Sequence, residues 1–299
     1  MTLPVSALPV EDAPAFLGVT RSATGRVWRD RLDPRGTARA LAIAQRYQVP
    51  EMLSRIIAGR GIDIDAVEDF LDPTIRKLLP DPLTVTDMEA AAKRIADAAA
   101  RGEKVAIFGD YDVDGATSAA LLTWYLRHCG LDPLIHIPDR IFEGYGPNVE
   151  AVRGLANKGA TLLVTVDCGT TSIEPLAEAK RLGMNVVVID HHQCGDELPV
   201  VDALVNPNRL DDLSGLGHLA AVGLVFVTLV AVNRELRARN FWSDVRPEPN
   251  LLDALHHVAL GTVADVAVLT GLNRAFVAKG LLALRRRDHI GHTALMAVA

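Results

Sequence analysis

The sequence predicts an α/β fold: a parallel sheet with helices on both faces, preceded by a small helical region and followed by further helices. Short apolar segments recur between stretches of helical period, which is the pattern of β-α-β units. These segments are continuous apolar runs rather than alternating ones, as expected for strands buried on both faces. The chain has 299 residues, of which 49% are hydrophobic, and this is enough material for about two domains.

Residues 1–85 are expected to form a mostly helical leader whose first residues are disordered. Asp-Pro steps at Asp33, Asp72 and Asp81 should interrupt its helices. The N-terminus has no basic segment followed by an apolar run, so it does not resemble a secretion signal. We therefore place the regular α/β core after this leader, at residues 86–240.

The core is expected to open with a helix and then to alternate strands and helices. Thr86 and Glu89 have the spacing of a capping box, and Gly102 stands where a C-cap belongs. Strands are predicted at 105–108, 134–137, 161–167, 185–190 and 202–205. The helices between them are predicted at 116–128, 148–158 and 171–182, each closed by a glycine.

Charge, cysteine content and one long apolar run limit the class of protein. Residues 216–232 are nearly long enough to span a bilayer, but they contain His218 and two glycines, so we favour a buried helix over a membrane span. The three cysteines form no C-x-x-C pair, which fits a reducing cytoplasm and no thiolate zinc site. The formal charge of −6 argues by itself against a polyanionic partner.

Acidic side chains and histidines follow three of the predicted strands. Because the carboxyl ends of parallel strands meet at one edge of a sheet, we expect these groups to lie on a common rim. They are Asp110, Asp112 and Asp114 after the first strand, Asp167 after the third, and Asp190, His191 and His192 after the fourth.

Carboxylates gathered on one rim repel one another, and a divalent cation is the simplest remedy. Carboxylates mixed with imidazole suit Mn²⁺ or Mg²⁺ better than a structural zinc ion, and we expect two Mn²⁺ ions, since such pairs hydrolyse phosphoesters. Two other interpretations stay open. The aspartates could be turn residues or helix caps. A calcium-binding loop is weaker, because Leu121 and Leu122 stand where its acidic ligand is expected.

Four motifs carry a family resemblance: GDYDVDGATS, TVDCGTTS, VIDHHQ and LGTVADVAVLTGLNR, in that order. Together they resemble the DHH phosphoesterase superfamily, and specifically its RecJ branch of single-strand-specific exonucleases. The resemblance covers roughly residues 45–299 and extends to the loop RIFEGYGPN at 140–148. It implies a set of metal ligands, with Asp167 bridging both ions: Asp110, Asp112, Asp114, Asp167, His191 and Asp265.

The same resemblance implies further site residues. His192 would either support a metal ligand or contact the phosphate and transition state, and Asp190 would orient a histidine. The residues that count as catalytic are Asp112, Asp114, Asp167, His191, His192 and Asp265. The candidates for holding the DNA strand are Thr117, Ser118, Arg140, Tyr145, Asn148, His192, His218 and Arg274. Arg140 and Tyr145 could equally pack a loop, and His218 could be a core histidine. His256 and His257 are expected to be helix packing or surface.

The activity implied is metal-dependent hydrolysis of phosphodiester bonds in single-stranded DNA, in the 5′ to 3′ direction, releasing mononucleotides in DNA repair and recombination. The partners implied are single-stranded DNA, with a single-strand-binding protein and a helicase as further candidates. The protein is expected to be monomeric and cytoplasmic, without contact to a membrane.

Two departures from the family pattern leave alternatives open. Phe108 stands where the wider superfamily has a histidine, so one ion should have an altered shell that Asp110 helps to complete. Residues 241–299 are expected to end the core, carry the last metal motif and start a linker to an absent domain, on which the basic DNA-binding surface could lie. The alternatives are a DHH phosphoesterase acting on short oligonucleotides, cyclic dinucleotides or pyrophosphate, and an inactive fragment.

Overall fold

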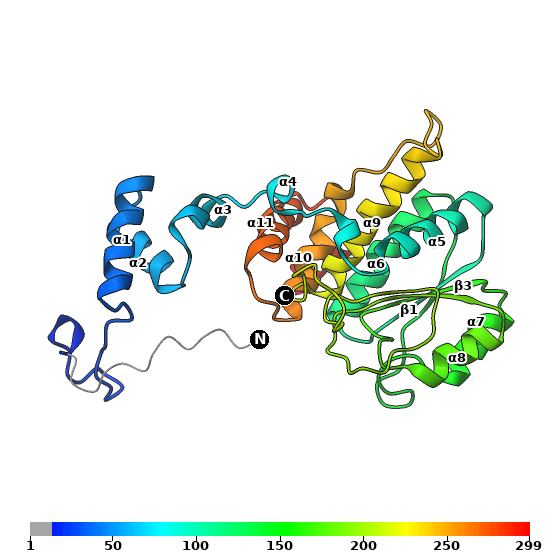
Figure 1. Ribbon diagram of the computed structural model, residues 1–299, viewed down its shortest axis with the longest axis horizontal. Coiled ribbons are helices and arrows are strands. Elements are labelled where there is room, and N and C mark those ends of the chain that lie inside the picture. Colours follow the sequence, from blue (N-terminus) through cyan, green and yellow to red (C-terminus); the bar gives the residue numbers. More distant parts are fainter. Residues whose placement is uncertain (1–13) are drawn as a thin grey trace. The chain divides into compact units, whose positions relative to one another are not determined.

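The computed structural model describes residues 14–299, and the chain divides after Asp72 into two compact units (Figure 1). The first residues, for which disorder is predicted, lie outside the described part. The division falls earlier than the expected end of the leader near residue 85. The physical reason is that Ile75 and Val85 are buried in the core of the second unit, which we call the sheet unit.

The N-terminal unit is helical where it is described. It contains α1 (Pro34–Tyr47), α2 (Glu51–Gly59), α3 (Val67–Leu71) and single 3₁₀ turns at Phe16–Gly18 and Ile64–Ala66. Ile43, Ile57 and Val67 form its own small core, and the Tyr47 hydroxyl donates to the Ile64 carbonyl at 2.6 Å. The Asp33-Pro34 step starts α1, because the Asp33 side chain accepts from the Gly36 N–H.

The sheet unit is built on five parallel strands in the order β2-β1-β3-β4-β5. They are β1 (Val105–Gly109), β2 (Leu134–His136), β3 (Leu162–Val166), β4 (Asn185–Ile189) and β5 (Ala203–Val205). All five predicted strands are confirmed. The strand order reverses between β1 and β3, so the carboxyl ends of these two strands frame the position where open α/β sheets bind ligands.

Helices cover both faces of this sheet, and alternate strand residues point to each face. Figure 1 shows α5 (Met88–Arg101), α6 (Val113–His128) and α9 (Ala221–Ala238) on one side, and α7 (Val149–Asn157) and α8 (Ile173–Arg181) on the other. In β1, Val105 and Ile107 join the core under α5, α6 and α9, whereas Ala106 and Phe108 join the core under α7 and α8. This double burial explains the continuous apolar strands.

The starts of α5 and α6 differ from the prediction because of specific side-chain contacts. Helix α6 begins three residues earlier than expected, because the Asp112 side chain accepts from the Gly115 N–H at 2.9 Å and caps the helix at that point. The capping box predicted for α5 is wrong. Asp87 is the N-cap residue there, the Thr86 N–H donates to Asp212, and Glu89 pairs with Lys93 instead.

The long apolar run becomes α9, which is buried along most of its length in the sheet unit. The helix begins at Ala221, so residues 216–220 form a loop before it. Over the described chain, none of the helices has the combined length and hydropathy that crossing a bilayer demands.

The remaining helices complete the sheet unit beyond the sheet itself. They are α4 (Ile75–Leu78), α10 (Leu255–Ala264), α11 (Gly271–Arg286) and α12 (Ile290–Val298), with 3₁₀ turns at Pro82–Thr84 and Leu251–Ala254. Helices α10 and α11 approach closely at Gly280, where an added Cβ would overlap the Leu255 carbonyl oxygen and lie 2.5 Å from the Ala259 Cβ. A side chain at this position would force the helices apart.

Replacing two helical glycines should therefore change stability in opposite directions. Gly280→Ala should lower the free energy of unfolding by about 1–3 kcal/mol through overpacking. The matched variant Gly154→Ala in α7 meets nothing within 4 Å and should raise it by about 0.5–1 kcal/mol, because alanine loses less backbone entropy in a helix. Urea denaturation of both variants measures these shifts, and a neutral Gly280→Ala would contradict the packing of α10 on α11.

Candidate metal centre

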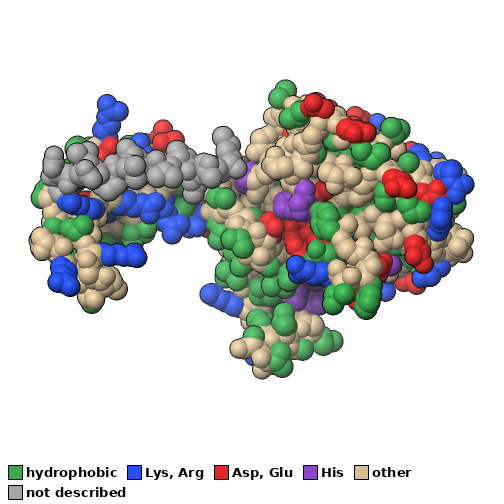
Figure 2. All heavy atoms as spheres, turned by 90° about the horizontal axis from the view of Figure 1, so that it is seen from below, with side chains coloured by type: hydrophobic (Ala, Val, Ile, Leu, Met, Phe, Trp, Pro, Cys, Tyr) green, Lys and Arg blue, Asp and Glu red, His purple; other side chains and the backbone are tan. Residues whose placement is uncertain are grey.

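The carboxyl ends of β1, β3 and β4 bring the predicted ligands together, although they come from four segments of the chain. Three overlapping groups have ligand atoms within 4.8 Å of one another: Asp110, Asp112 and Asp167; Asp167, His191 and His192; Asp114, His191 and Asp265. Asp167 and His191 each belong to two groups, so the three groups form one continuous site. Figure 2 shows acidic side chains gathered beside histidines at a hollow in one face of the molecule.

Asp167 lies at the centre of this site and has an unusual environment. Its backbone is left-handed, with φ 62°, and the residue is 1% exposed. Within residues 14–299, neither carboxylate oxygen has a hydrogen-bond partner, although the Nε2 atom of His191 lies 3.2 Å from Oδ1. Burial raises the pKa of Asp167 to about 8. Two buried carboxylate oxygens without donors fit a cation better than any neutral partner.

His191 is oriented so that one ring nitrogen faces the carboxylates. Its Nδ1 lies 3.1 Å from the Leu219 carbonyl, which can only accept, so Nδ1 carries the proton and Nε2 faces Asp167. Nε2 is also 3.8 Å from Asp114. Burial opposes protonation, but the charges of Asp167 and Asp114 outweigh it and raise the His191 pKa to about 9. In the absence of a cation, protons thus offset part of the negative charge.

Asp190 differs from the other carboxylates because donors surround it. Its oxygens accept from the N–H groups of Thr170, His191 and His192, and from the His192 ring at 2.7 Å. Burial alone would raise its pKa, yet the bonds from His192 and Thr170 lower it to about 2. Asp190 therefore holds the turn that carries both histidines and fixes the His192 ring. This agrees with the expectation that Asp190 orients a histidine.

Asp114 links α6 and α9, two helices that are far apart in the sequence. Its oxygens accept from the Ala221 N–H at 2.6 Å and the Val222 N–H at 2.9 Å, which are otherwise unpaired donors in the first turn of α9. The residue is buried, and burial raises its pKa to about 6. A carboxylate at a helix N-terminus is favourably placed. Asp114 thus positions α9 as well as facing His191 and Asp265.

The other acidic residues complete the rim. Asp110 is buried with Oδ1 unpartnered among the described residues, and burial raises its pKa. Asp112 is exposed, whereas Asp265 is half-buried at the end of α10, where burial raises its pKa. Phe108 is fully buried under the other face, with its ring 4.9 Å from the ring of His136. Carboxylates with imidazole and no thiolate are a donor set for Mn²⁺ or Mg²⁺.

The predicted DNA-contact residues are not all at the rim. The Tyr145 hydroxyl lies 3.1 Å from the His192 Nδ1, and Arg140 lies over the Tyr111 ring at 5.1 Å. Thr117 and Ser118 are instead buried, which argues against a direct contact with DNA.

The remaining three candidates have structural contacts of their own. Asn148 caps α7 with its carbonyl oxygen and donates to Glu143. His218 is half-buried, and its backbone carbonyl accepts from Asn273. Arg274 lies in the first turn of α11.

Sequence reasoning missed two sets of residues near the site. Phe142, which is 87% exposed, and Tyr111 add aromatic surface beside Arg140 and Tyr145. Both could have been recognised from the sequence, because Tyr111 lies in the GDYDVDGATS motif and Phe142 lies in the loop RIFEGYGPN. The second set supports the histidine turn from the segment that follows β5: Asn206 donates to the His192 carbonyl and Asn208 to the His191 carbonyl. Only the fold reveals that contact.

Comparisons with known proteins agree with this geometry. The family model for the DHH family, N-terminal domain, matches residues 104–262, which include all the rim residues except Asp265. Single-stranded-DNA-specific exonucleases RecJ of Salmonella typhimurium and Bacillus subtilis are 38% and 34% identical over 240 and 250 residues. The alignments cover 79% and 84% of this chain but 41% and 30% of those relatives, so the chain spans less than half their length.

Solved structures show the same fold. The crystal structure of exonuclease RecJ bound to manganese has a TM-score of 0.63 and 32% identity, covering 74% of this chain and 53% of that one. RecJ from Thermus thermophilus, in complex with Mn²⁺, has a TM-score of 0.72 and 29% identity, covering 89% of this chain and 36% of that one. The predicted fold class is confirmed.

Two carboxylates of this rim should contribute to stability with opposite signs. Asp190→Asn turns an amide donor towards N–H groups, so the free energy of unfolding should fall by about 2–4 kcal/mol at pH 7. Burial makes Asp167 take up a proton on folding at pH 7, a cost that asparagine does not have, so the metal-free Asp167→Asn protein should gain about 1–3 kcal/mol at pH 7. Urea denaturation of metal-free protein measures both changes.

The pH dependence separates the two effects. The pKa of Asp167 is raised from 3.8 to about 8, so its destabilising effect is small near pH 4 and grows as the pH rises towards 8. The pKa of Asp190 is lowered from 3.8 to about 2, so its stabilising effect is complete above pH 4 and disappears as the pH falls towards 2. Shifts of the same sign at pH 7 would contradict this assignment.

Proposed function

This chain belongs to the DHH family, and from that premise we propose that it is the catalytic part of a metal-dependent exonuclease specific for single-stranded DNA. The observation that carries the proposal is the buried Asp167, whose carboxylate oxygens have no hydrogen-bond partner in the described chain although the residue belongs to two of the three ligand groups. The names of the RecJ relatives support the same substrate.

The ligands proposed for two Mn²⁺ ions, with Mg²⁺ as an alternative, are Asp110, Asp112, Asp114, Asp167, His191 and Asp265. When bound, the ions would activate water and offset charge on the phosphate oxygens. Asp167 is the proposed shared ligand, because it belongs to two of the three ligand groups. Relatives whose structures are described as manganese and magnesium complexes support this choice.

His192 is proposed to contact the scissile phosphate. Its side chain is 45% exposed, and the hydrogen bond from its ring to Asp190 raises its pKa. The buried carboxylate holds the ring in place and favours its protonated form, which offers a preorganised donor for a phosphate oxygen. Tyr145 contacts the same ring through its hydroxyl and limits its rotation. Asp190 and Tyr145 thus act by positioning His192.

Single-strand specificity is proposed to come from the aromatic surface of the loop at 140–146. Exposed aromatic rings stack on unpaired bases, and a nearby cation holds the backbone. Phe142 is 87% exposed, and Arg140 lies over Tyr111, which is edge-to-face with Tyr145. Bases already stacked in a duplex cannot use these faces. The family resemblance alone supports the remaining parts of the proposal. These are the 5′ to 3′ direction, the release of mononucleotides, and a monomeric, cytoplasmic protein that works with a single-strand-binding protein and a helicase.

The nuclease proposal predicts a specific loss of activity. With Mn²⁺ and 5′-labelled DNA, the chain should degrade single strands and spare duplexes, and Asp167→Ala should reduce the rate by about 100-fold or more. Asp132→Asn is the control. Asp132 is a carboxylate whose side chain is 82% exposed, and it precedes β2, so it lies at the amino-terminal end of that strand rather than at the rim. Undegraded single strands, or an active Asp167→Ala variant, would refute the proposal.

The affinity of the metal-free chain for Mn²⁺ should rise by at least about tenfold between pH 6 and pH 8, because ligands must lose protons on binding. The raised pKa values of Asp167, about 8, and His191, about 9, place that loss in the neutral range. Calorimetric titration in two buffers of different ionisation enthalpy measures both the affinity and the protons released. An affinity independent of pH, with no protons released, would contradict these ligands.

A further inference from the structure

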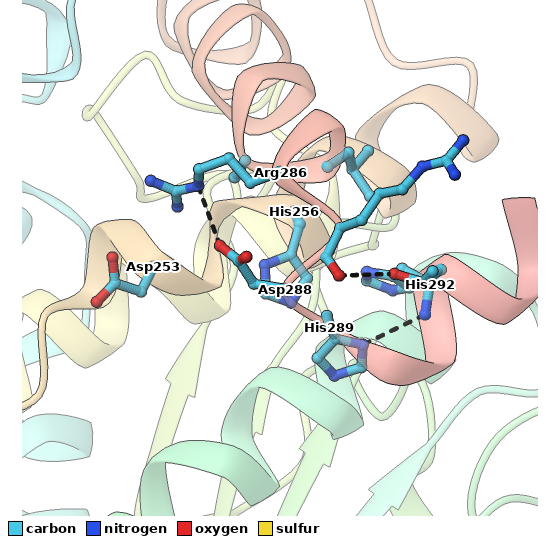
Figure 3. A pocket seen from close by; sticks show the side chains of 10 residues that line it. Asp253, His256, Arg286, Asp288, His289 and His292 are labelled. Carbon is cyan, nitrogen blue, oxygen red and sulfur yellow. Dashed lines mark hydrogen bonds and ion pairs between the residues drawn. The ribbon is translucent and has the colours of Figure 1, made fainter.

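A second cluster of histidines lies away from the rim, between α10 and α12. His256 and His257 come from the first turn of α10, while His289 caps α12 and His292 lies in its first turn. Their ring centroids are 4.2–5.0 Å apart. Figure 3 shows His256, His289 and His292 grouped at the wall of one cavity. Sequence reasoning treated His256 and His257 as packing or surface, because nothing along the chain connects them with residues 289 and 292.

Several ring nitrogens of this cluster lack partners. His256 Nε2, His257 Nδ1 and His292 Nδ1 are buried, and the described residues provide no hydrogen bond to them. His257 is only 6% exposed. Buried polar atoms are normally paired, and leaving them unpaired costs free energy. A cluster with three such nitrogens is therefore a candidate for binding a Lewis acid such as a metal ion.

His256, His257 and His292 are in the form that binds metals. Burial, followed by repulsion from the neighbouring histidines, lowers the pKa of His256 to about 4 and that of His257 to about 3. Burial also lowers the pKa of His292. The three rings are uncharged near pH 7, and neutral imidazole is the metal-ligating state.

We propose that His256, His289 and His292 form a second metal site, for a borderline transition-metal ion such as Zn²⁺, that ties α12 to α10. One nitrogen from each of these rings lies within 4.8 Å of the others. An imidazole set without carboxylates favours Zn²⁺, Ni²⁺ or Cu²⁺ over the Mn²⁺ and Mg²⁺ that suit the rim. Three histidines leave one position of a tetrahedral ion open. The adjoining cavity of about 380 Å³, which Asp253 and Asp288 also line, has space for a water molecule there.

The position of α12 gives this ion a structural role. No residue of α12 is buried by the described chain, so packing alone holds it weakly. The His289 Nδ1 accepts from the His292 N–H at 3.3 Å, which is long for such a bond. Binding an ion through that nitrogen would replace only this weak bond, because the Thr293 N–H still donates to the His289 carbonyl at 2.9 Å.

The test separates this cluster from the rim by working in an Asp167→Asn background with excess Mg²⁺. The double variant His289→Gln/His292→Gln is compared with that parent and with His128→Gln, a histidine outside both clusters whose ring contacts the Pro247 carbonyl. Metal-stripped proteins are dialysed against Zn²⁺ alone as the added transition metal. Bound zinc is then counted by atomic emission, and thermal unfolding is recorded with and without zinc.

The parent and the His128→Gln variant should each bind one more zinc ion per chain than the double variant. Their unfolding temperature should rise by about 5–10 °C at zinc 100-fold above the dissociation constant, whereas that of the double variant should not. Without zinc, the double variant should unfold at the same temperature as the parent, because α12 has no buried residue.

Equal zinc binding by the parent and the double variant would overturn the proposal. The four imidazoles would then only pack against one another. No zinc binding by the parent would overturn it equally. If the double variant unfolds early without zinc, His292→Gln alone is measured in its place, and retention of the zinc ion by that variant counts against the site. These results are independent of nuclease activity, since Asp167 is substituted throughout.

Discussion

The concentration of carboxylates at one edge of the sheet is the constraint on which the rest of this structure depends. Like charges a few ångströms apart in a poorly solvated site cannot all stay ionised without compensation. The protein compensates in two ways within its own atoms. Asp190 is stabilised by four donors, and Asp114 by two N–H groups at the start of α9. Asp167 has neither, so protons or cations must balance its charge.

This arrangement couples folding to the site. Asp114 is 107 residues from Ala221 along the chain, yet its carboxylate determines where α9 begins and how it sits against α6. The loop before α9 in turn supplies the Leu219 carbonyl that orients His191. A change in either helix therefore alters both the packing of the core and the direction in which His191 presents its lone pair. Stability and site geometry share the same hydrogen bonds.

The sequence predicted the strands and the members of the rim well, because both depend on local pattern and on the rule that parallel strands end at one edge. It did not predict contacts between segments that are far apart in the chain. The burial of Thr117 follows from the close approach of α10 to α6, where an added Cβ on Gly261 would overlap the Thr117 hydroxyl. The predicted capping box failed for the same kind of reason, because the Asp212 loop takes the Thr86 N–H.

The histidine cluster and the carboxylate rim lie at opposite ends of α10, and this separation limits how they can influence each other. His256 and Asp265 are nine residues apart on one helix, which corresponds to about 13 Å along its axis. That distance is much longer than the 4.8 Å within which the ligand atoms of the rim groups lie, so an ion at the histidines would change the field at the rim less than the rim's own charges do. Its effect would be mechanical. Fixing the first turn of α10 against α12 restricts the tilt of the helix whose last turn presents Asp265 to His191.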